Sequence, residues 1–370
     1  MEFKKHKLGE FIDTISETST IKKQQVVLIN TSDVENGKVL NHKYTENKNL
    51  KGQFKKRFRK DDILYSEIRP KNKRFAYVDF DASDYIASTK LMVLRNKGNI
   101  DNTFLYQLLK SNKIINQLQL LAESRSGTFP QITFNELANV EIEIPNIENQ
   151  IKISKILTDI DSKIEINNQT NDNLLNIGME FLKEDFKNVV KNEILSNVIK
   201  FVKGKKPLNI SNEIQEGYDK YLTIACLNGQ ELNYADSTKA ILSNNDLLMV
   251  MDGASSGDVY YGGKGVVGST LSRVDCIDNN YIPEFIYFVM KYYKKLIQSK
   301  NTGSAIPHTD KVFVGTLEIP KLLKEQQEKY KILLNKIIQN INENEILTQL
   351  RDTLLPKLMN GEIDLDKIEI

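Results

Sequence analysis

The sequence has few of the residues that build disulfide frameworks or metal centres. Its 370 residues include 2 cysteines, Cys226 and Cys276, and 3 histidines, His6, His42 and His308. The histidines lie far apart, and neither set has the spacing of a zinc site. Two cysteines also cannot form a disulfide framework. We therefore expect a reduced, cytoplasmic protein with no metal bound to this chain.

Long apolar runs are also missing. No stretch of 18 consecutive apolar residues occurs, so the sequence predicts no membrane-spanning helix. The first ten residues, MEFKKHKLGE, lack the apolar segment of a signal peptide. Both absences agree with a soluble protein that has no membrane partner.

Signatures of catalysis are absent as well. The nearest approach to a phosphate-binding loop is Gly263-Lys264, but Gly265 stands where Ser or Thr would hold Mg²⁺. There is no glycine-rich dinucleotide motif, no Asn/Asp-Pro-Pro-aromatic tetrad and no assignable Ser/His/Asp set. Residues 307–311 (PHTDK) are only weakly similar to a nuclease motif. We expect no catalytic residue and no cofactor-binding residue in this chain.

What the chain does contain is a long duplication. The segment 145–186 is repeated, with changes, at 320–362, and both copies are rich in Ile, Leu, Asn, Lys and Glu. An offset of 176 aligns Gln150 with Gln326 and Leu182 with Leu358, with a one-residue slip needed in the middle. Each copy begins at a proline, which is favourable at the start of a helix. Two long helices are predicted.

The first copy carries one narrow apolar stripe. Its members recur at alternating steps of four and three, the pattern of a coiled-coil seam: Ile153, Leu157, Ile160, Ile164, Asn167, Asn171, Leu174, Gly178 and Phe181. A helix of 40 residues is roughly 60 Å long and needs a partner helix to cover such a stripe. We expect the two copies to pack antiparallel, with Asn167 and Asn171 near the seam. The alternative is two unrelated surface helices.

The repeat extends into the segments before the helices. Residues 62–66 correspond to 246–250, and 104–106 correspond to 285–287, with single helices expected over 103–121 and 284–299. The predicted fold is therefore α+β, with two pseudo-repeated globular domains separated by two long antiparallel helices. We place the first domain at 1–145, the first helix at 146–187, the second domain at 188–320, and the second helix with a C-terminal tail at 321–370.

Positive charge gathers in one part of the first half. Residues 48–74 hold 11 Lys/Arg against 3 Asp/Glu, a net charge of +8. Such loops bind DNA phosphates, and Arg also reads guanine; the alternative is a solvated basic loop. The candidate DNA-binding residues here are Lys55, Lys56, Arg57, Arg59, Arg69, Lys71, Asn72, Lys73 and Arg74.

The second half has a different hairpin. Residues 252–257 and 261–265 are rich in small residues, which let backbone N–H groups approach a phosphate; a simple turn is the alternative. Each half also has a glycine loop that either contacts DNA or a partner, or only shapes the chain. The candidates from these segments are Ser126, Gly127, Thr128, Ser255, Ser256, Lys264, Thr302, Gly303, Ser304 and His308.

Taken together, the chain resembles the specificity subunit of type I restriction–modification systems. The resemblance covers residues 5–365 and rests on the stretch 126–157, its echo at 302–334, and LLPKLMNGEI at 354–363. It implies two target recognition domains, each reading one half of a split, asymmetric site in double-stranded DNA. It further implies that the paired helices act as a spacer and dock two methyltransferase subunits, with or without restriction subunits. S-adenosylmethionine, ATP and Mg²⁺ would then act in those partner subunits.

Two other functions remain open at this stage. The chain could be a stand-alone nuclease or methyltransferase, against which the missing motifs count. It could also be a structural coiled-coil scaffold for other proteins, against which the basic run at 48–74 counts.

Overall fold

The computed structural model describes residues 2–18, 21–48, 50, 52–124, 130–189, 191–303, 305–363 and 365. Its contacts divide the chain into two units. The first unit combines residues 1–163 with 346–370, and the second comprises 164–345. Each unit thus contains one globular half and a segment of both long helices.

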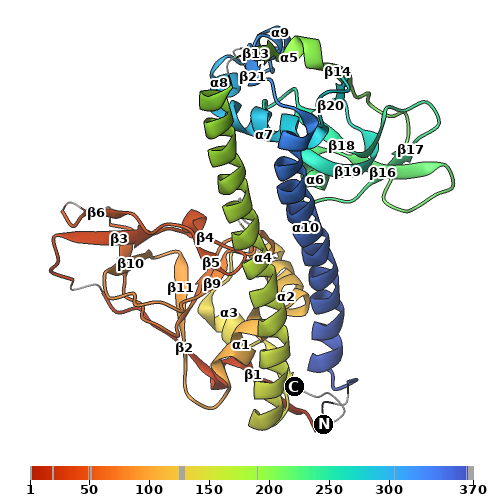
Figure 1. Cartoon of the computed structure of the whole chain (residues 1–370). Helices are drawn as coiled ribbons and strands as arrows, with labels where there is room; N and C mark the ends of the chain where they lie inside the picture. The colour runs from red at the N-terminus through yellow and green to blue at the C-terminus, as the bar shows by residue number, and fades with distance from the viewer. Residues whose placement is uncertain are drawn as a thin grey trace. The chain divides into compact units, whose positions relative to one another are not determined.

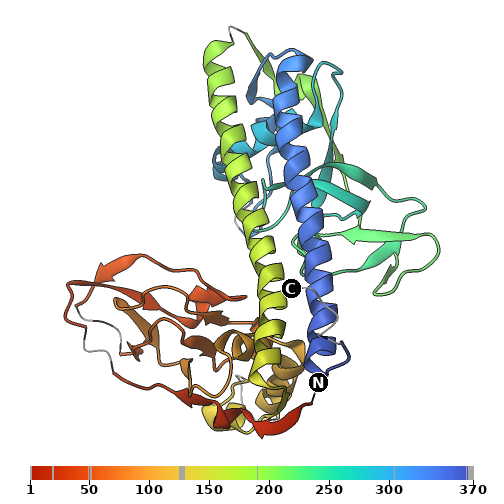
Figure 2. The same cartoon turned by 60° about the horizontal axis from the view of Figure 1, so that its bottom comes forward.

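The two long helices are α4 (Ile147–Asn188) and α10 (Lys324–Met359). Within the second unit, Asp185 of α4 bonds Tyr330 of α10, and Asn171 bonds Asn340. Later residues of α4 therefore contact earlier residues of α10, which means that the two helices pack antiparallel (Figures 1 and 2). This confirms the predicted pairing.

The predicted seam is confirmed in part, because Gly178 packs against Phe288, which lies outside the two long helices. Ile153 and Leu157 are fully buried, and Asn167 and Asn171 are buried despite their polar side chains. Asn167 donates to Asn344 at 2.9 Å, and Asn340 donates to Asn171 at 2.8 Å. Since each buried amide has a partner on the facing helix, these pairs favour one register over others.

The first unit packs two sheets beside a helical cluster. One sheet has the order β2-β11-β8-β9 and the other β6-β3-β10-β7, with β3 and β10 parallel. The strands of these sheets are β2 (Ile12–Thr14), β3 (Gln25–Ile29), β6 (Tyr44–Glu46), β7 (Phe54–Lys56), β8 (Ile63–Ser66), β9 (Phe75–Tyr77), β10 (Tyr85–Ser88) and β11 (Leu91–Asn96). Smaller pairs are formed by β1 (Lys4–Lys7) with β12 (Glu141–Ile144), and by β4 (Val34–Glu35) with β5 (Lys38–Val39).

Helices α1 (Asn102–Leu109), α2 (Asn112–Glu123) and α3 (Phe134–Ala138) complete this unit. The prediction of one helix over 103–121 was wrong. Ser111 separates α1 from α2, because its hydroxyl accepts the N–H of Ile114 and so begins a new helix. Phe104, Leu118, Ile153, Leu157 and Leu358 share one core, which joins α1 and α2 to both long helices.

The second unit is built around one larger sheet. Its order is β14-β20-β18-β19-β16-β17-β15. The strands are β14 (Ile199–Lys203), β15 (Ile210–Ser211), β16 (Tyr218–Leu222), β17 (Tyr234–Asp236), β18 (Leu242–Val250), β19 (Val259–Val267) and β20 (Leu271–Cys276). A separate pair, β13 (Asn192–Ile194) with β21 (Glu318–Pro320), repeats the pairing of β1 with β12.

The helices of the second unit are α5 (Leu195–Val198), α6 (Ile224–Leu227), α7 (Pro283–Tyr292), α8 (Lys294–Ser299) and α9 (Lys311–Gly315). The single helix expected over 284–299 is again two, α7 and α8. Phe285 and Phe288 of α7 pack against Tyr330 of α10 and close the core on the helix pair.

The repeat between the long helices needs a correction of one residue at its start. The Gln150 side chain accepts the N–H of Asp101 and donates to Pro145 O. Gln327, not Gln326, makes the matching bonds, to Ile282 and Leu322. The two glutamines are adjacent, so residue identity alone could not show which of them is buried. The equivalent helix positions here lie 177 apart.

Among the described residues, no helix combines the length and the apolarity needed to cross a membrane.

Candidate nucleic-acid interface

The basic segment 69–74 forms the loop of a β hairpin. This first hairpin loop, residues 67–74, connects β8 to β9 and contains the short 3-10 helix η3 (Pro70–Asn72). The N–H of Ser66 donates to Arg74 O at 2.9 Å and closes the base of the loop. The Lys71 N–H donates to the buried Gln119 side chain at 3.1 Å. The loop is therefore held through its backbone, while Lys71, Asn72 and Lys73 are exposed.

Two residues of this loop have left-handed backbone conformations. Arg69 has φ 45° and Lys73 has φ 52°. Residues other than glycine rarely adopt such angles, because the Cβ atom crowds the backbone. Asn36 has φ 46°, and its N–H donates to Lys73 O at 2.9 Å. Backbone strain thus gathers beside the exposed basic side chains, a pattern typical of functional sites.

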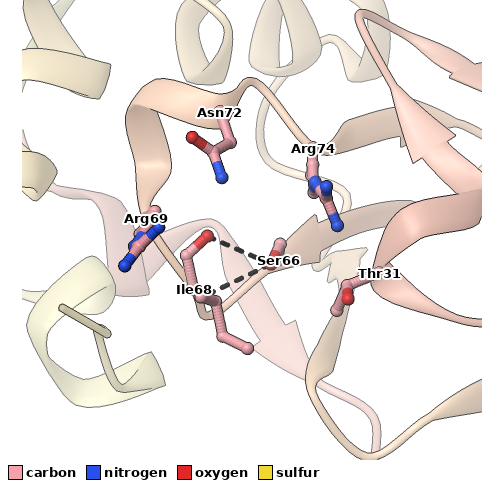
Figure 3. A pocket seen from close by; sticks show the side chains of 6 residues that line it. All are labelled: Thr31, Ser66, Ile68, Arg69, Asn72 and Arg74. Atoms are coloured by element: carbon pink, nitrogen blue, oxygen red, sulfur yellow. Dashed lines mark hydrogen bonds between the residues drawn. The ribbon is translucent and has the colours of Figure 1, made fainter. Parts of the chain in front are cut away.

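A shallow pocket of about 210 Å³ lies at the inner side of this loop (Figure 3). Arg69 and Arg74 lie on opposite sides of it, and the Ser66 hydroxyl bonds the backbone of Ile68 at its base. Two guanidinium groups with hydroxyl and amide neighbours suit an anionic oxygen or the edge of a base. The lining residues are Thr31, Ser66, Ile68, Arg69, Asn72 and Arg74.

The second basic run, 55–60, lies at the other end of strand β8. Lys55, Arg57 and Arg59 are exposed there. Lys56 is turned inward, and its ammonium donates to Leu91 O at 2.8 Å. Burial lowers the pKa of Lys56. The structure therefore separates the two basic runs, and Lys56 serves to fix strand β7 to β11.

Two acidic residues follow this run, and of these Asp61 is exposed and Asp62 is not. Asp62 is buried and holds Arg95 through two bonds of 2.8 Å. Its second oxygen also accepts the N–H of Arg59 at 2.9 Å. Arg95 therefore balances the charge of Asp62 inside the unit, while Asp61 is the acidic side chain exposed beside the basic run.

In the second unit, the small-residue segment and the glycine loop lie together. The second hairpin loop, residues 251–258, connects β18 to β19. Its Gly253 N–H donates to Pro307 O at 2.9 Å, and Thr302 pairs with His308 through two backbone bonds. Five of the candidates thus gather in one place: Ser255, Ser256, Thr302, Gly303 and His308.

Three side chains, from Asp252, His308 and Lys203, meet at the centre of this cluster. His308 Nδ1 is 2.7 Å from Asp252 Oδ1, and Lys203 Nζ is 3.4 Å from Oδ2 of the same carboxylate. Burial would raise the pKa of the Asp252 carboxyl, but the bond with His308 and the charge of Lys203 outweigh it and lower the pKa. With Nδ1 engaged, the exposed His308 ring has its Nε2 atom left for an outside partner.

Not every candidate in this half belongs to one surface. Ser256 is fully buried, and its hydroxyl donates to Gly253 O at 2.7 Å and Pro307 O at 2.8 Å, so it holds the two loops together. Lys264 is exposed but pairs with Asn244, at the far end of the β18–β19 hairpin. Ser126, Gly127, Thr128 and Ser304 lie outside the described residues.

Some contributors were not identified from the sequence. Thr31 and Ser66 line the first pocket, and Asp252 and Lys203 fix His308. These residues come from elements far apart along the chain, so no local pattern indicates them. The described residues also hold no group of three or more His, Cys, Asp and Glu side chains arranged for a metal.

Comparison with known proteins gives a consistent result. The chain matches the type I restriction modification DNA specificity domain over residues 1–176 and 188–352. The type I restriction enzyme HindI specificity subunit of Haemophilus influenzae is 31% identical over 98% of this chain and 100% of its own length. The MjaVIII specificity subunit of Methanocaldococcus jannaschii is 30% identical over 44% of this chain and 40% of its own.

The fold has a solved counterpart. The S subunit of a type I restriction–modification system from M. genitalium superimposes with a TM-score of 0.56 at 18% identity, covering 97% of this chain and 96% of its own. The matched family domain is a DNA specificity domain and not a catalytic one. This chain belongs to the DNA specificity family of type I restriction–modification systems, as a non-catalytic subunit that recognises DNA.

Proposed function

We propose that this chain reads a bipartite, asymmetric DNA sequence, one half-site with each globular half. The observation that carries the proposal is that both halves place a hairpin loop beside the segment leading to the long helix, while the side chains of the two loops differ. The first loop is basic, whereas the second has small residues next to the Asp252–His308 pair. Two surfaces of different chemistry suit two different base sequences.

The first half supplies the stronger electrostatic contact. Lys55, Arg57 and Arg59 contact phosphates at one end of β8, and Arg69, Lys71, Asn72, Lys73 and Arg74 approach the duplex at the other. The second half uses Ser255, Thr302, Gly303 and His308, with Lys264 as a more distant phosphate contact.

We further propose that α4 and α10 set the distance between the half-sites and dock two methyltransferase subunits. Both helices expose large apolar side chains, which would be covered if a partner subunit packed along them. These are Ile147, Ile151, Ile166 and Ile177 on α4, and Ile332, Ile341, Ile346 and Leu350 on α10. S-adenosylmethionine, and ATP with Mg²⁺ where restriction subunits join, act in those partners, and the complex works in the cytoplasm.

Sequencing of DNA methylation tests this function. The chain is expressed with its methyltransferase partner in a host that lacks other methylation, and a host with the methyltransferase alone is the control. The expected result is one motif with two specified parts and an unspecified spacer of fixed length. A motif without a spacer, or the same motif from the methyltransferase alone, would contradict the proposal.

A further inference from the structure

The two hairpin loops share most of their backbone hydrogen bonds, although the N–H of Lys73 donates to Pro70 O and that of its counterpart Gly257 donates to Val250 O. Ser66 N–H donates to Arg74 O at 2.9 Å in the first, and Val250 N–H donates to Asp258 O at 2.8 Å in the second. Arg69 N–H donates to Pro130 O at 3.0 Å, and Gly253 N–H donates to Pro307 O at 2.9 Å. Each residue of the second loop stands 184 positions after its counterpart, with no insertion between them.

The correspondence continues on both sides of the loop. The Glu67 N–H donates to Lys90 O, and the Glu67 carbonyl accepts the N–H of Ile132. In the same way, the Met251 N–H donates to Thr270 O, and the Met251 carbonyl accepts the N–H of Thr309. Inside the loop, the N–H of Asn72 reaches Arg69 O, and that of Ser256 reaches Gly253 O. All of these bonds join main-chain atoms, so they can form with different side chains in the loop. In the second loop, the Ser256 hydroxyl adds bonds to Gly253 O and Pro307 O.

The side chains of the two loops differ. Four positions of the first loop are basic, Arg69, Lys71, Lys73 and Arg74, and they correspond to Gly253, Ser255, Gly257 and Asp258. The positive φ angles fall at equivalent places: 45° at Arg69 against 103° at Gly253, and 52° at Lys73 against 91° at Gly257. Glycine adopts these angles without strain, so glycine would be favoured at both positions if the loop only had to turn the chain. The first loop instead has long cationic side chains at both strained positions.

We propose that residues 69–74 and 253–258 are interchangeable specificity segments, each determining bases within its own half-site. This inference rests on the proposed function above and adds to it which segment carries the choice of bases. Arg69 and Asn72, beside the pocket of the first loop, match the hydrogen-bonding edges of guanine and adenine. Ser255 and the neighbouring Asp252–His308 pair present a hydroxyl and an imidazole instead.

A segment exchange tests the proposal. Residues 69–74 (RPKNKR) are replaced by GASSGD, the sequence of 253–258, and the variant is expressed with the methyltransferase partner. The methylation motif should change in one half-site only, with the other half-site and the spacer retained. The reciprocal exchange should change the opposite half-site. An active exchange variant whose two half-sites are unchanged would overturn the proposal.

Single variants decide the question if the exchanged chain does not fold. Arg69→Gly keeps the loop conformation, because glycine tolerates the positive φ, and removes only the side chain. It should relax discrimination at one position of one half-site by about 10-fold or more, as should Asn72→Ala at another. Lys113→Ala, which removes an exposed charge from α2 of the same unit, is the control and should leave the motif unchanged.

These outcomes separate the two proposals. If the natural chain itself gives no motif with two separated parts, the proposed function fails, whatever the variants do. If the natural motif is bipartite but Arg69→Gly and Asn72→Ala leave every position as selective as before, only the assignment of the segments fails.

Discussion

Gly178 of α4 lies against the ring of Phe288 of α7, so closely that a Cβ atom built on this glycine would be 2.1 Å from the Phe288 Cε1 atom. Phe288 is fully buried and packs against Tyr330, so its ring has no free space to move into. The absence of a side chain at position 178 therefore allows α7 to pack this closely on α4 within the second unit.

Gly178→Ala should lower the stability of the second unit. Alanine in a helix gains about 1 kcal/mol over glycine, but forcing a methyl group into a packed core costs about 1–3 kcal/mol. With a ring at 2.1 Å, the overpacking cost should be larger. Chemical denaturation should show a lower midpoint, and adding Phe288→Leu should restore part of it. Asn173→Ala, at an exposed position of the same helix, is the control and should not lower the midpoint.

Asp161 joins three elements of the first unit. Its carboxylate bonds Arg351 of α10 at 3.0 Å and forms an ion pair with Lys110, which follows α1. Asp161→Asn should cost about 1–3 kcal/mol, because two partly buried cations would lose their shared counter-charge. Asp352→Asn, which removes a more exposed partner of the same Arg351, should cost less than about 1 kcal/mol. Equal losses of stability in the two variants would show that Asp161 contributes no more to the unit than the more exposed Asp352.

The same carboxylate predicts a pH dependence. Burial would raise the pKa of Asp161, but Lys110, Gln107 and Arg351 outweigh this effect, so the pKa is lowered. A carboxyl group whose pKa is lowered by folding stabilises the fold at pH values above its pKa in the unfolded chain, which is about 3.9 for Asp. That stability is lost as the pH falls through the lower, folded value. The difference in free energy of unfolding between the natural chain and Asp161→Asn should be largest near pH 7 and should decrease below about pH 4. A gap that grows in acid would contradict this assignment.

The basic hairpin loop predicts a salt dependence. Replacing Arg69, Lys71 and Lys73 together with Ala should weaken DNA binding. It should also flatten the plot of log affinity against log salt by about one unit for each phosphate that the variant no longer binds. If Arg69 reads guanine, discrimination at one base should also fall by roughly 1–3 kcal/mol. Binding is measured by titration of a duplex at several salt concentrations.

The control for this prediction removes the same charge elsewhere. Lys22, Lys43 and Lys113 are exposed residues of the first unit outside the loop. If their triple replacement flattens the salt plot as much as the loop variant does, net charge and not the loop governs binding. An unchanged plot in the loop variant would show that the loop is only solvated.

The helix pair predicts how the spacer of the DNA site is set. One heptad inserted after Lys163 in α4 and one before Ile346 in α10 keeps the seam in register, since the apolar pattern repeats every seven residues. Each heptad adds roughly 10 Å, equivalent to about three base pairs at ~3.4 Å each. Both half-sites should be retained while the spacer lengthens by up to about three base pairs, less if the DNA bends.

Two results bear on this interpretation of the helices. Three residues inserted into α4 alone should break the seam and abolish methylation. An unchanged spacer after the paired heptad insertion would show that these helices do not set it.

Much of the architecture could be predicted from the sequence because it depends on local periodicity. The seam from Ile153 to Phe181 follows from steps of three and four, and the duplication indicated the partner helix. Patterns of this kind do not distinguish between adjacent similar residues. For that reason Gln327 was missed in favour of Gln326. The cap at Ser111 lies in a short polar run, 110–113, which a continuous helix could also carry on its exposed face.

The candidate site could be predicted only in outline. Charge indicated the segment 48–74, but charge alone cannot show that Lys56 faces inward or that the two basic runs lie at opposite ends of β8. The left-handed conformation of Arg69 carries no signal in the sequence, because it is imposed by the bond to Pro130. Interactions between distant segments decide these features, and the pattern of neighbouring residues does not include them.

The main-chain bonds that hold each hairpin loop have a consequence for how such proteins evolve. Because Ser66 with Arg74 and Arg69 with Pro130 are joined by N–H and C=O groups, most substitutions in the loop leave the anchoring bonds in place. If the loop contacts DNA as proposed, point mutations there alter the side chains that meet the DNA without first lowering the amount of folded protein. If the loop selects bases as proposed, changes in a few codons give this protein another DNA target, while the rest of the gene stays as it is.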